Sequence, residues 1–261
     1  MDMSNISVKP SGAALGAEIH GLDLAQPLGD SEIAALRQAL HEHLVIAIPG
    51  QKLTPAQTAA FCRRFGPITR HILDQFYHPE EPDLCIISNV VESGKGRTTA
   101  RMAGSYWHSD LSYIAEPVDA SMLYAIEVPE AGGDTLFANL YDAFNTLPAD
   151  MQTRLRGLNA VHNLMSGSGA DSKVALSDAQ RAKVPDATHP VVRRHPETGR
   201  EALFVNPGFT RRIEGMDAEE SDALLQQLYD HATEERFTYR HKWRPGDLTL
   251  FDGRASMHSA T

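Results

Sequence analysis

The sequence has little cysteine, no long apolar run and no excess of positive charge. Its 261 residues include only two cysteines, Cys62 and Cys85, which lack the C-x-x-C spacing of metal and redox motifs. This number excludes a disulfide scaffold, and because both cysteines lie in apolar runs we expect reduced thiols in the core. No apolar run approaches the roughly 20 residues that span a bilayer, and the N-terminal MDMSNISVKPSG lacks signal-peptide character. We therefore expect a cytoplasmic protein.

The charge balance excludes some classes of partner. Lysine and arginine number 24 against 34 aspartates and glutamates, so the formal net charge is −10 with neutral histidine. Such a surface repels phosphate backbones and anionic lipids, so we expect no nucleic acid and no membrane among the partners. With 42% hydrophobic residues and no internal repeat, residues 1–261 are expected to form a single globular domain.

Apolar periodicity predicts a mainly β fold with helical insertions. A capping box formed by Thr54 and Gln57 marks the start of one helix. Helices are expected over 31–44, 55–65, 140–155 with a break at Pro148, and 217–233. Short strands are expected over 45–48, 84–88, 120–126, 135–138, 191–194, 202–205, 237–243 and 248–251. Many short strands favour a sandwich or barrel over a doubly wound sheet, and no nucleotide-binding glycine motif is present.

Two long segments have the composition of loops. Residues 92–105 and 164–187 are rich in glycine, serine and charged residues, and each lies between expected strands. Loops of this length in a single domain usually carry function, so we regard both as candidate active-site loops or lids.

Twelve histidines make metal binding worth considering, and three of them begin an H-x-[DE] triplet. In His78–Glu80 and His195–Glu197 the middle residue is proline, which predicts solvated turns. His108 and Asp110 instead lie in an unbroken run of aromatic and small polar residues. If that run is extended, both side chains share a face and supply two ligands of a 2-His-1-carboxylate iron site. A purely structural His–Asp pair is the alternative.

The third ligand of such a site would be a histidine from a distant segment. His41, His43 and His231 lie on expected helices and are predicted to be at the surface. His258 follows a strand, a turn and a second strand within 243–254, where a ligand lining a barrel could lie.

Seven short segments, in one order along the chain, make the pattern specific. They are Gly12–Ile19 with Gly21–Leu24, Arg64–Gly66, Trp107–Asp110, Gly132–Thr135, His189–Val192, Leu203–Asn206 and Trp243–His258. In these segments the chain resembles the TauD/TfdA family of Fe(II)- and 2-oxoglutarate-dependent dioxygenases. The resemblance implies a double-stranded β-helix (jelly-roll, cupin-like) core flanked by helices. It also implies an enzyme that uses Fe(II), 2-oxoglutarate and O₂ to hydroxylate a small anionic substrate, with release of succinate and CO₂.

The resemblance also implies roles for individual residues. His108, Asp110 and His258 match the iron ligands, and Thr135 matches the residue that binds the distal carboxylate of 2-oxoglutarate. His71 matches the histidine that binds the substrate sulfonate in taurine-oxidising members.

The aromatic residues near the triplet, and two departures from the family pattern, concern the substrate. We expect Tyr106 and Tyr113 to face it. Asp74 and Gly104 stand where taurine-oxidising members carry a tyrosine and an asparagine, and a carboxylate in place of an anion-facing donor disfavours taurine. Sulfonates, alkylsulfates and phenoxyalkanoates remain candidate substrates. A non-redox metal hydrolase and a non-catalytic jelly-roll binding module remain alternative functions.

The resemblance extends to assembly and to the C-terminus. Family members are commonly dimers or tetramers, so a homodimer or homotetramer is expected. The sequence ends at Thr261, three residues after His258, where members continue into a final strand. We therefore expect that this strand is missing and that the 2-oxoglutarate-binding arginine would lie beyond Thr261.

Overall fold

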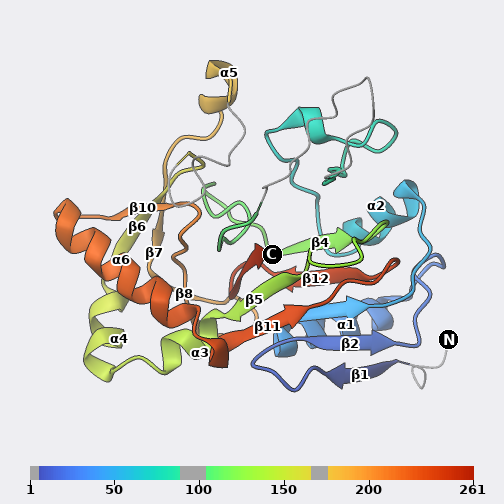
Figure 1. The fold of residues 1–261 in the computed structure, drawn as a ribbon, viewed down its shortest axis with the longest axis horizontal. Helices are drawn as coiled ribbons and strands as arrows, with labels where there is room; N and C mark the ends of the chain where they lie inside the picture. Colours follow the sequence, from blue (N-terminus) through green and yellow to red (C-terminus); the bar gives the residue numbers. More distant parts are fainter. Residues whose placement is uncertain (1–5, 89–103, 166–175) are drawn as a thin grey trace.

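Two β-sheets that face each other form the centre of the structure, a computed structural model that describes residues 6–88, 104–165 and 176–261 (Figure 1). The strands are β1 (Ser7–Pro10), β2 (Ala17–His20), β3 (Val45–Ile48), β4 (Ala120–Tyr124), β5 (Thr135–Asn139), β6 (Asn159–His162), β7 (Ala187–Pro190), β8 (Val192–Arg194), β9 (Glu201–Leu203), β10 (Thr210–Ile213), β11 (Thr238–His241), β12 (Leu248–Asp252) and β13 (Ser256–Ala260). The helices are α1 (Asp30–His43), α2 (Pro55–Arg63), α3 (Leu140–Asn145), α4 (Ala149–Arg156), α5 (Asp178–Arg181) and α6 (Ala218–Ala232), with short 3₁₀ turns η2 (Asp74–Phe76) and η4 (Glu235–Phe237).

Strand order places distant parts of the chain side by side. One sheet has the order β1-β2-β3-β12-β4, and the sheet that faces it has the order β11-β5-β13. Smaller sheets of order β10-β6-β7 and β8-β9 extend the structure. In the two central sheets only β2 and β3 pair in parallel, and the other pairs are antiparallel. The C-terminal strands β12 and β13 therefore lie in opposite sheets and close the core.

Alternation along the strands separates two hydrophobic cores. Phe137 of β5 and Phe251 of β12 meet between the sheets, with ring centroids 5.2 Å apart. On the other face of the larger sheet, Leu248 and Leu250 pack with the apolar side of α1. That side contains Ile33, Leu36 and Leu40, in the spacing that predicted the helix. Figure 1 shows α1 and α2 at one end of the molecule and α3, α4 and α6 at the other.

The helix boundaries follow from local chemistry and confirm the predictions. At α2 the Thr54 Oγ1 accepts from Gln57 N at 3.2 Å, and Gln57 Oε1 accepts from Thr54 N at 2.9 Å. Pro148 separates α3 from α4. At α6 the Asp217 carboxylate accepts from Glu220 N at 2.9 Å.

Other predictions were wrong. Residues 84–88 form no strand; within the part of the chain that the structure describes, no strand pairs with them, and they make a single bridge between Cys85 and Tyr77. Cys85 is exposed rather than buried, and Cys62 is half-buried against Met122. Strands β1, β2, β6, β7, β10 and β13 were not predicted, since each has only four or five residues and owes its strand form to pairing with another strand.

The two predicted loops are described only in part. Residues 89–103 and 166–175 lie outside the described residues, so most of 92–105 and the middle of 164–187 are not characterised. The described end of the second segment is not entirely a loop, because Ser177 and Gln180 form a capping box at α5. Among the described helices, none is long and apolar enough to cross a membrane.

Candidate active site

Two backbone hydrogen bonds bring the H-x-D segment to the last strand. His108 N donates to the His258 carbonyl at 2.9 Å, and His258 N donates to the His108 carbonyl at 2.8 Å. His258 lies in β13 opposite Phe137 of β5, so its ring points between the two sheets, where it also contacts Phe251. Residues separated by 150 positions in the sequence thus become direct neighbours.

The side chains of His108, Asp110 and His258 converge there. The Asp110 Oδ1 lies 3.5 Å from His108 Nε2 and 4.0 Å from His258 Nε2. One potential ligand atom from each residue lies within 4.8 Å of the other two. Both histidines are buried and Asp110 is half-buried. Two imidazoles and one carboxylate are the donor set of a 2-His-1-carboxylate iron site.

Hydrogen bonding and burial keep these donors in the form that a metal needs. His108 Nδ1 lies 2.8 Å from the Tyr106 carbonyl, which can only accept, so Nδ1 carries the hydrogen and Nε2 offers its lone pair. Burial, together with the neighbouring His108, lowers the pKa of His258 to about 3 and keeps it neutral. Burial raises the pKa of Asp110, but its polar surroundings, including a hydrogen bond from Ser121, lower it overall, so the carboxylate is ionised.

Thr135 lies on the same wall as His258. It is two residues before Phe137 on β5, so both side chains share a face, and it is buried. Trp243 Nε1 donates to Thr135 Oγ1 at 3.0 Å, which leaves the threonine's own hydrogen to be donated elsewhere. Across the ladder from Thr135 lies His241, whose buried Nε2 lies 3.5 Å from Asp247 Oδ2 and has no hydrogen-bond partner among the described residues.

The candidate substrate residues form a second wall beside Asp110. Tyr113 is buried, its ring packs 4.8 Å from Phe209, and its Oη lies 3.1 Å from His71 Nε2. Phe209 in turn contacts the His108 ring at 5.7 Å. Tyr106 is half-buried, with its ring 5.0 Å from that of His108. The structure thus brings all three predicted substrate residues close to the H-x-D segment.

Hydrogen-bond accounting fixes the protonation of His71. Its Nδ1 accepts from Leu73 N at 3.1 Å, so a neutral ring carries its hydrogen on Nε2 and donates it to the Tyr113 hydroxyl. Burial lowers the pKa of His71, which keeps the ring neutral near pH 7. The hydrogen of the Tyr113 hydroxyl is then available for another acceptor.

The two departures from the family pattern have different structural settings. Asp74 is exposed on η2. This position gives no support to the expectation that its carboxylate disfavours an anionic substrate inside the site. Gly104 has φ of 77°, and a Cβ there would lie 3.2 Å from His108 Cε1. Glycine at this position therefore leaves room for the ligand ring.

Gly208, which the sequence did not single out, also approaches the site closely. A Cβ at this position would lie 2.7 Å from the His108 Cβ and 2.8 Å from Tyr106 Cε2. Its backbone N donates to the Trp107 carbonyl at 2.9 Å. The glycine in the sequence Asn-Pro-Gly-Phe was the available signal, but only the fold shows what it approaches.

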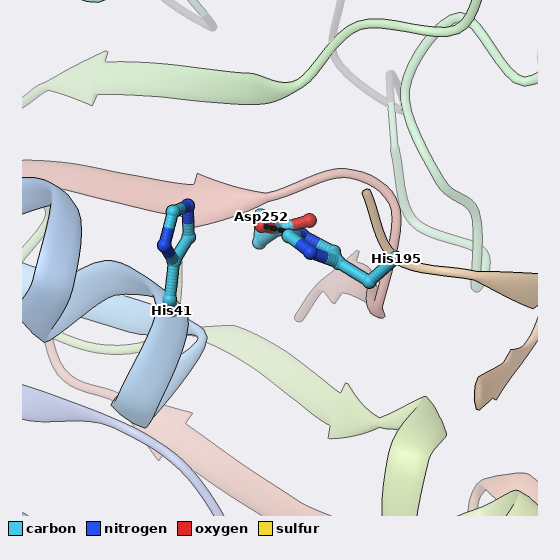
Figure 2. A group of neighbouring side chains, drawn as sticks. All are labelled: His41, His195 and Asp252. Atoms are coloured by element: carbon cyan, nitrogen blue, oxygen red, sulfur yellow. Dashed lines mark hydrogen bonds and ion pairs between the residues drawn. The ribbon is translucent and has the colours of Figure 1, made fainter. Parts of the chain in front are cut away.

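A second His/Asp group lies outside this site (Figure 2). It consists of His41 at the end of α1, His195 and Asp252. His195 was predicted to be solvated in a turn, and this was wrong: its side chain is 1% exposed and its Nε2 lies 2.9 Å from Asp252 Oδ2. The turn signal of the adjacent proline is real, but the ring points inward to the carboxylate. The helix histidines His41, His43 and His231, which were predicted to be at the surface, are half-buried.

Arg254 completes this second group. Its guanidinium contacts Asp252, and its Nη1 also contacts Asp119 at 3.0 Å and Glu197 at 2.8 Å. These three acidic partners account for the charge of Arg254, which is buried.

Comparison with known proteins gives one consistent result. The family model described as "Taurine catabolism dioxygenase TauD, TfdA family" matches residues 7–261. The chain is 34% identical to the alpha-ketoglutarate-dependent 2,4-dichlorophenoxyacetate dioxygenase of Cupriavidus pinatubonensis, over 97% of this chain and 91% of that protein. It is 32% identical to pentalenolactone F synthase of Streptomyces avermitilis, over 99% of this chain and 88% of that protein. The crystal structure of a taurine dioxygenase from Burkholderia xenovorans superposes with a TM-score of 0.82 at 35% identity, covering 98% of this chain and 82% of that one.

Proposed function

The chain belongs to the taurine catabolism dioxygenase TauD, TfdA family, and from this premise we propose that His108, Asp110 and His258 bind its catalytic iron. The protein is a 2-oxoglutarate-dependent non-haem iron dioxygenase with a jelly-roll core that acts on a small organic substrate. The fold, the reaction class and the use of Fe(II), 2-oxoglutarate and O₂ were predicted from the sequence and are confirmed. The residues and the substrate class are our proposal.

The observation that carries the iron assignment is the convergence of three ligand atoms within 4.8 Å. The donor set fits ferrous iron, because two imidazole nitrogens and one ionised carboxylate lie close enough together to bind a single ion. When bound there, Fe(II) supplies the chemistry that couples decarboxylation of 2-oxoglutarate by O₂ to hydroxylation of a C–H bond, giving succinate and CO₂. The part of the protein is to hold the ligands, orient both substrates and exclude water.

We assign the distal carboxylate of 2-oxoglutarate to Thr135. The threonine shares an inward face with Phe137, the cross-strand neighbour of His258, so it lies about 7 Å along the strand from the iron ligand. This spacing suits a five-carbon diacid that reaches from the metal to the hydroxyl. The buried His241 ring across the ladder from Thr135, with its Nε2 3.5 Å from Asp247 Oδ2, makes this part of the interior polar.

We further propose that the substrate is a small carboxylic acid with an apolar body. The Tyr113 hydroxyl, with its hydrogen free to be donated, faces the region beside Asp110 as an anion-recognising group backed by His71. Around it lies an apolar cluster, to which the described ends of segment 164–187 contribute Leu164 and Leu176. A relative of this chain is named for 2,4-dichlorophenoxyacetate, an acid with such a body. We therefore place aryloxyalkanoates ahead of sulfonates.

Substrate-dependent succinate release tests this assignment. The anaerobic protein is loaded with Fe(II) and 2-oxoglutarate and then mixed with O₂ and a panel of phenoxyalkanoates, alkylsulfates and sulfonates. We expect phenoxyalkanoates to give the largest stimulation of succinate release. If sulfonates do so instead, the proposed substrate class is wrong. Hydrolysis without 2-oxoglutarate, or ligand binding without turnover of any acid, would contradict the iron assignment itself.

Assembly and location are separate proposals. We propose a homodimer or homotetramer, which light scattering coupled to size-exclusion chromatography measures. We also propose that the protein works in the cytoplasm, where 2-oxoglutarate and reduced iron are available; fractionation of cells that express the tagged protein tests this.

A further inference from the structure

A buried hydrogen bond links the two segments that carry the proposed iron ligands. Ser109, between His108 and Asp110, is 2% exposed, and its Oγ donates to the Ser256 carbonyl at 2.9 Å. Ser256 begins β13, two residues before His258. The middle residue of the H-x-D motif therefore contacts the strand that supplies the third ligand.

Ser256, the acceptor in this hydrogen bond, is itself held by a further hydrogen bond. Ser256 Oγ donates to the Asp252 carbonyl oxygen at 2.6 Å, across the turn between β12 and β13. The Asp252 carboxylate is fully buried and accepts hydrogen bonds from His195 and from Arg254. A continuous buried path thus runs from His195 through Asp252 and Ser256 to Ser109.

The hydrogen bonds of Asp252 exclude a metal site at this end of the path. Oδ2 accepts from His195 Nε2 at 2.9 Å and from Arg254 Nη2 at 3.0 Å. Oδ1 accepts from Arg254 N at 2.8 Å and Arg254 Nε at 3.4 Å. A carboxylate has about four lone-pair positions, and all are engaged. The adjacent guanidinium also repels a cation, so the group in Figure 2 is a support for the β12–β13 turn.

The segment that Ser109 fastens has a strained backbone. Leu111, directly after Asp110, has φ of 51°, a conformation that residues with a large side chain rarely adopt. Such a residue keeps this conformation only where the surroundings enforce it. The two backbone bonds between His108 and His258 fix the residue before Ser109, and Gly208 N also donates to the Trp107 carbonyl on the other side of His108. The Ser109 hydroxyl adds a further bond one residue closer to Asp110.

We propose that Ser109 is a positioning residue that fixes Asp110 relative to His258. The proposal rests on the iron assignment above. It predicts that the hydroxyl of Ser109, which is not itself a ligand, sets the affinity and geometry of the metal centre.

Cobalt binding to the full chain tests the proposal without turnover. The apoprotein is titrated with Co(II), which gives a dissociation constant and visible d–d bands that depend on ligand geometry. We expect Ser109→Ala to bind Co(II) about tenfold more weakly, with altered bands, as for other groups that orient metal ligands. Ser109→Thr keeps the hydroxyl and should restore both signals.

Ser221→Ala is the matched control. Ser221 is also buried, and its Oγ accepts from Ile213 N at 2.9 Å, in α6 and away from the metal centre. It should lower thermal stability about as much as Ser109→Ala and leave Co(II) binding unchanged.

The possible outcomes separate the two proposals. If the wild-type protein does not bind Co(II), or His258→Ala binds it equally well, the iron assignment fails. If the wild-type protein binds Co(II) and Ser109→Ala matches it in affinity and spectrum, only the role of Ser109 is overturned. A loss that Ser109→Thr does not restore, or that Ser221→Ala shares, would also overturn that role.

Discussion

Replacing Tyr113 by phenylalanine tests how this enzyme recognises its substrate. The change removes only the hydroxyl that accepts from His71 at 3.1 Å, and it keeps the ring that packs on Phe209. Burial and the nearby Asp110 carboxylate raise the pKa of Tyr113, so the hydroxyl keeps its hydrogen at all working pH values. In our proposal that hydrogen is donated to the carboxylate of the substrate.

The structure sets the size of the effect. A hydrogen bond to a charged group contributes about 1.5–3 kcal/mol, which corresponds to roughly a 10- to 100-fold rise in the substrate KM. The value of kcat should change little, since the hydroxyl recognises the acid group and not the reacting carbon. Because His71 is neutral, with its pKa lowered by burial, KM should also be nearly constant from pH 6.5 to 8.5.

The assay is steady-state succinate release with a phenoxyalkanoate and with the matching uncharged amide. The Tyr113→Phe variant should discriminate against the acid and leave the amide unaffected. Tyr124→Phe is the control, because its hydroxyl makes two hydrogen bonds, at 3.0 and 3.1 Å, beside the other core. An unchanged KM for the acid, or an equal rise for the amide, would refute the reasoning.

Three further predictions concern stability and packing. Burial, together with the neighbouring His189, lowers the pKa of His162 to about 3, below its value in the unfolded chain. As the pH falls, the unfolded chain therefore takes up the proton first. The free energy of unfolding should decrease by about 1.4 kcal/mol per pH unit below pH 6.5. Urea unfolding at pH 7 and 4.5 should show a smaller loss for His162→Phe, and an equal loss would contradict the assignment. Arg254→Met leaves the buried Asp252 carboxylate without its cationic partner and should lower the unfolding free energy by about 3–5 kcal/mol. A decrease under 1 kcal/mol would show that the ion pair is not desolvated. Gly208→Ala places a methyl group 2.7 Å from the His108 Cβ and should weaken Co(II) binding, while Gly157→Ala, which meets only a carbonyl at 3.8 Å, should be tolerated; equal Co(II) affinity in the two variants would count against this packing.

The local sequence pattern predicted those features that are set by residues close together in the chain. The H-x-D spacing brings His108 and Asp110 together, although the run is not extended as expected, because only His108 forms a β-bridge and Asp110 begins a turn. A capping box sets the start of α2. The third ligand was different, because the strands and turn before His258 made it only one candidate among several histidines. Its role came from the resemblance to a family, and its neighbour His108 lies in a segment 150 positions away.

The errors have a common physical origin in contacts between distant segments. His195 was read as a solvated turn residue because proline follows it, but its ring donates to Asp252, 57 positions later. Residues 84–88 have the composition of a strand and lack a partner strand. The sequence did not predict a role for Ser109, because that role depends on a hydrogen bond to the Ser256 carbonyl, which sequence alone does not place beside it.

The most direct measurement of the central claim is the visible charge-transfer band of the Fe(II)–2-oxoglutarate complex, recorded without O₂. The structure offers two His/Asp groups for comparison, so the measurement uses one variant in each. If His108, Asp110 and His258 hold the iron, His258→Gln abolishes the band and His41→Gln retains it with wild-type intensity. A band that survives in His258→Gln, or that disappears in His41→Gln alone, would contradict the account.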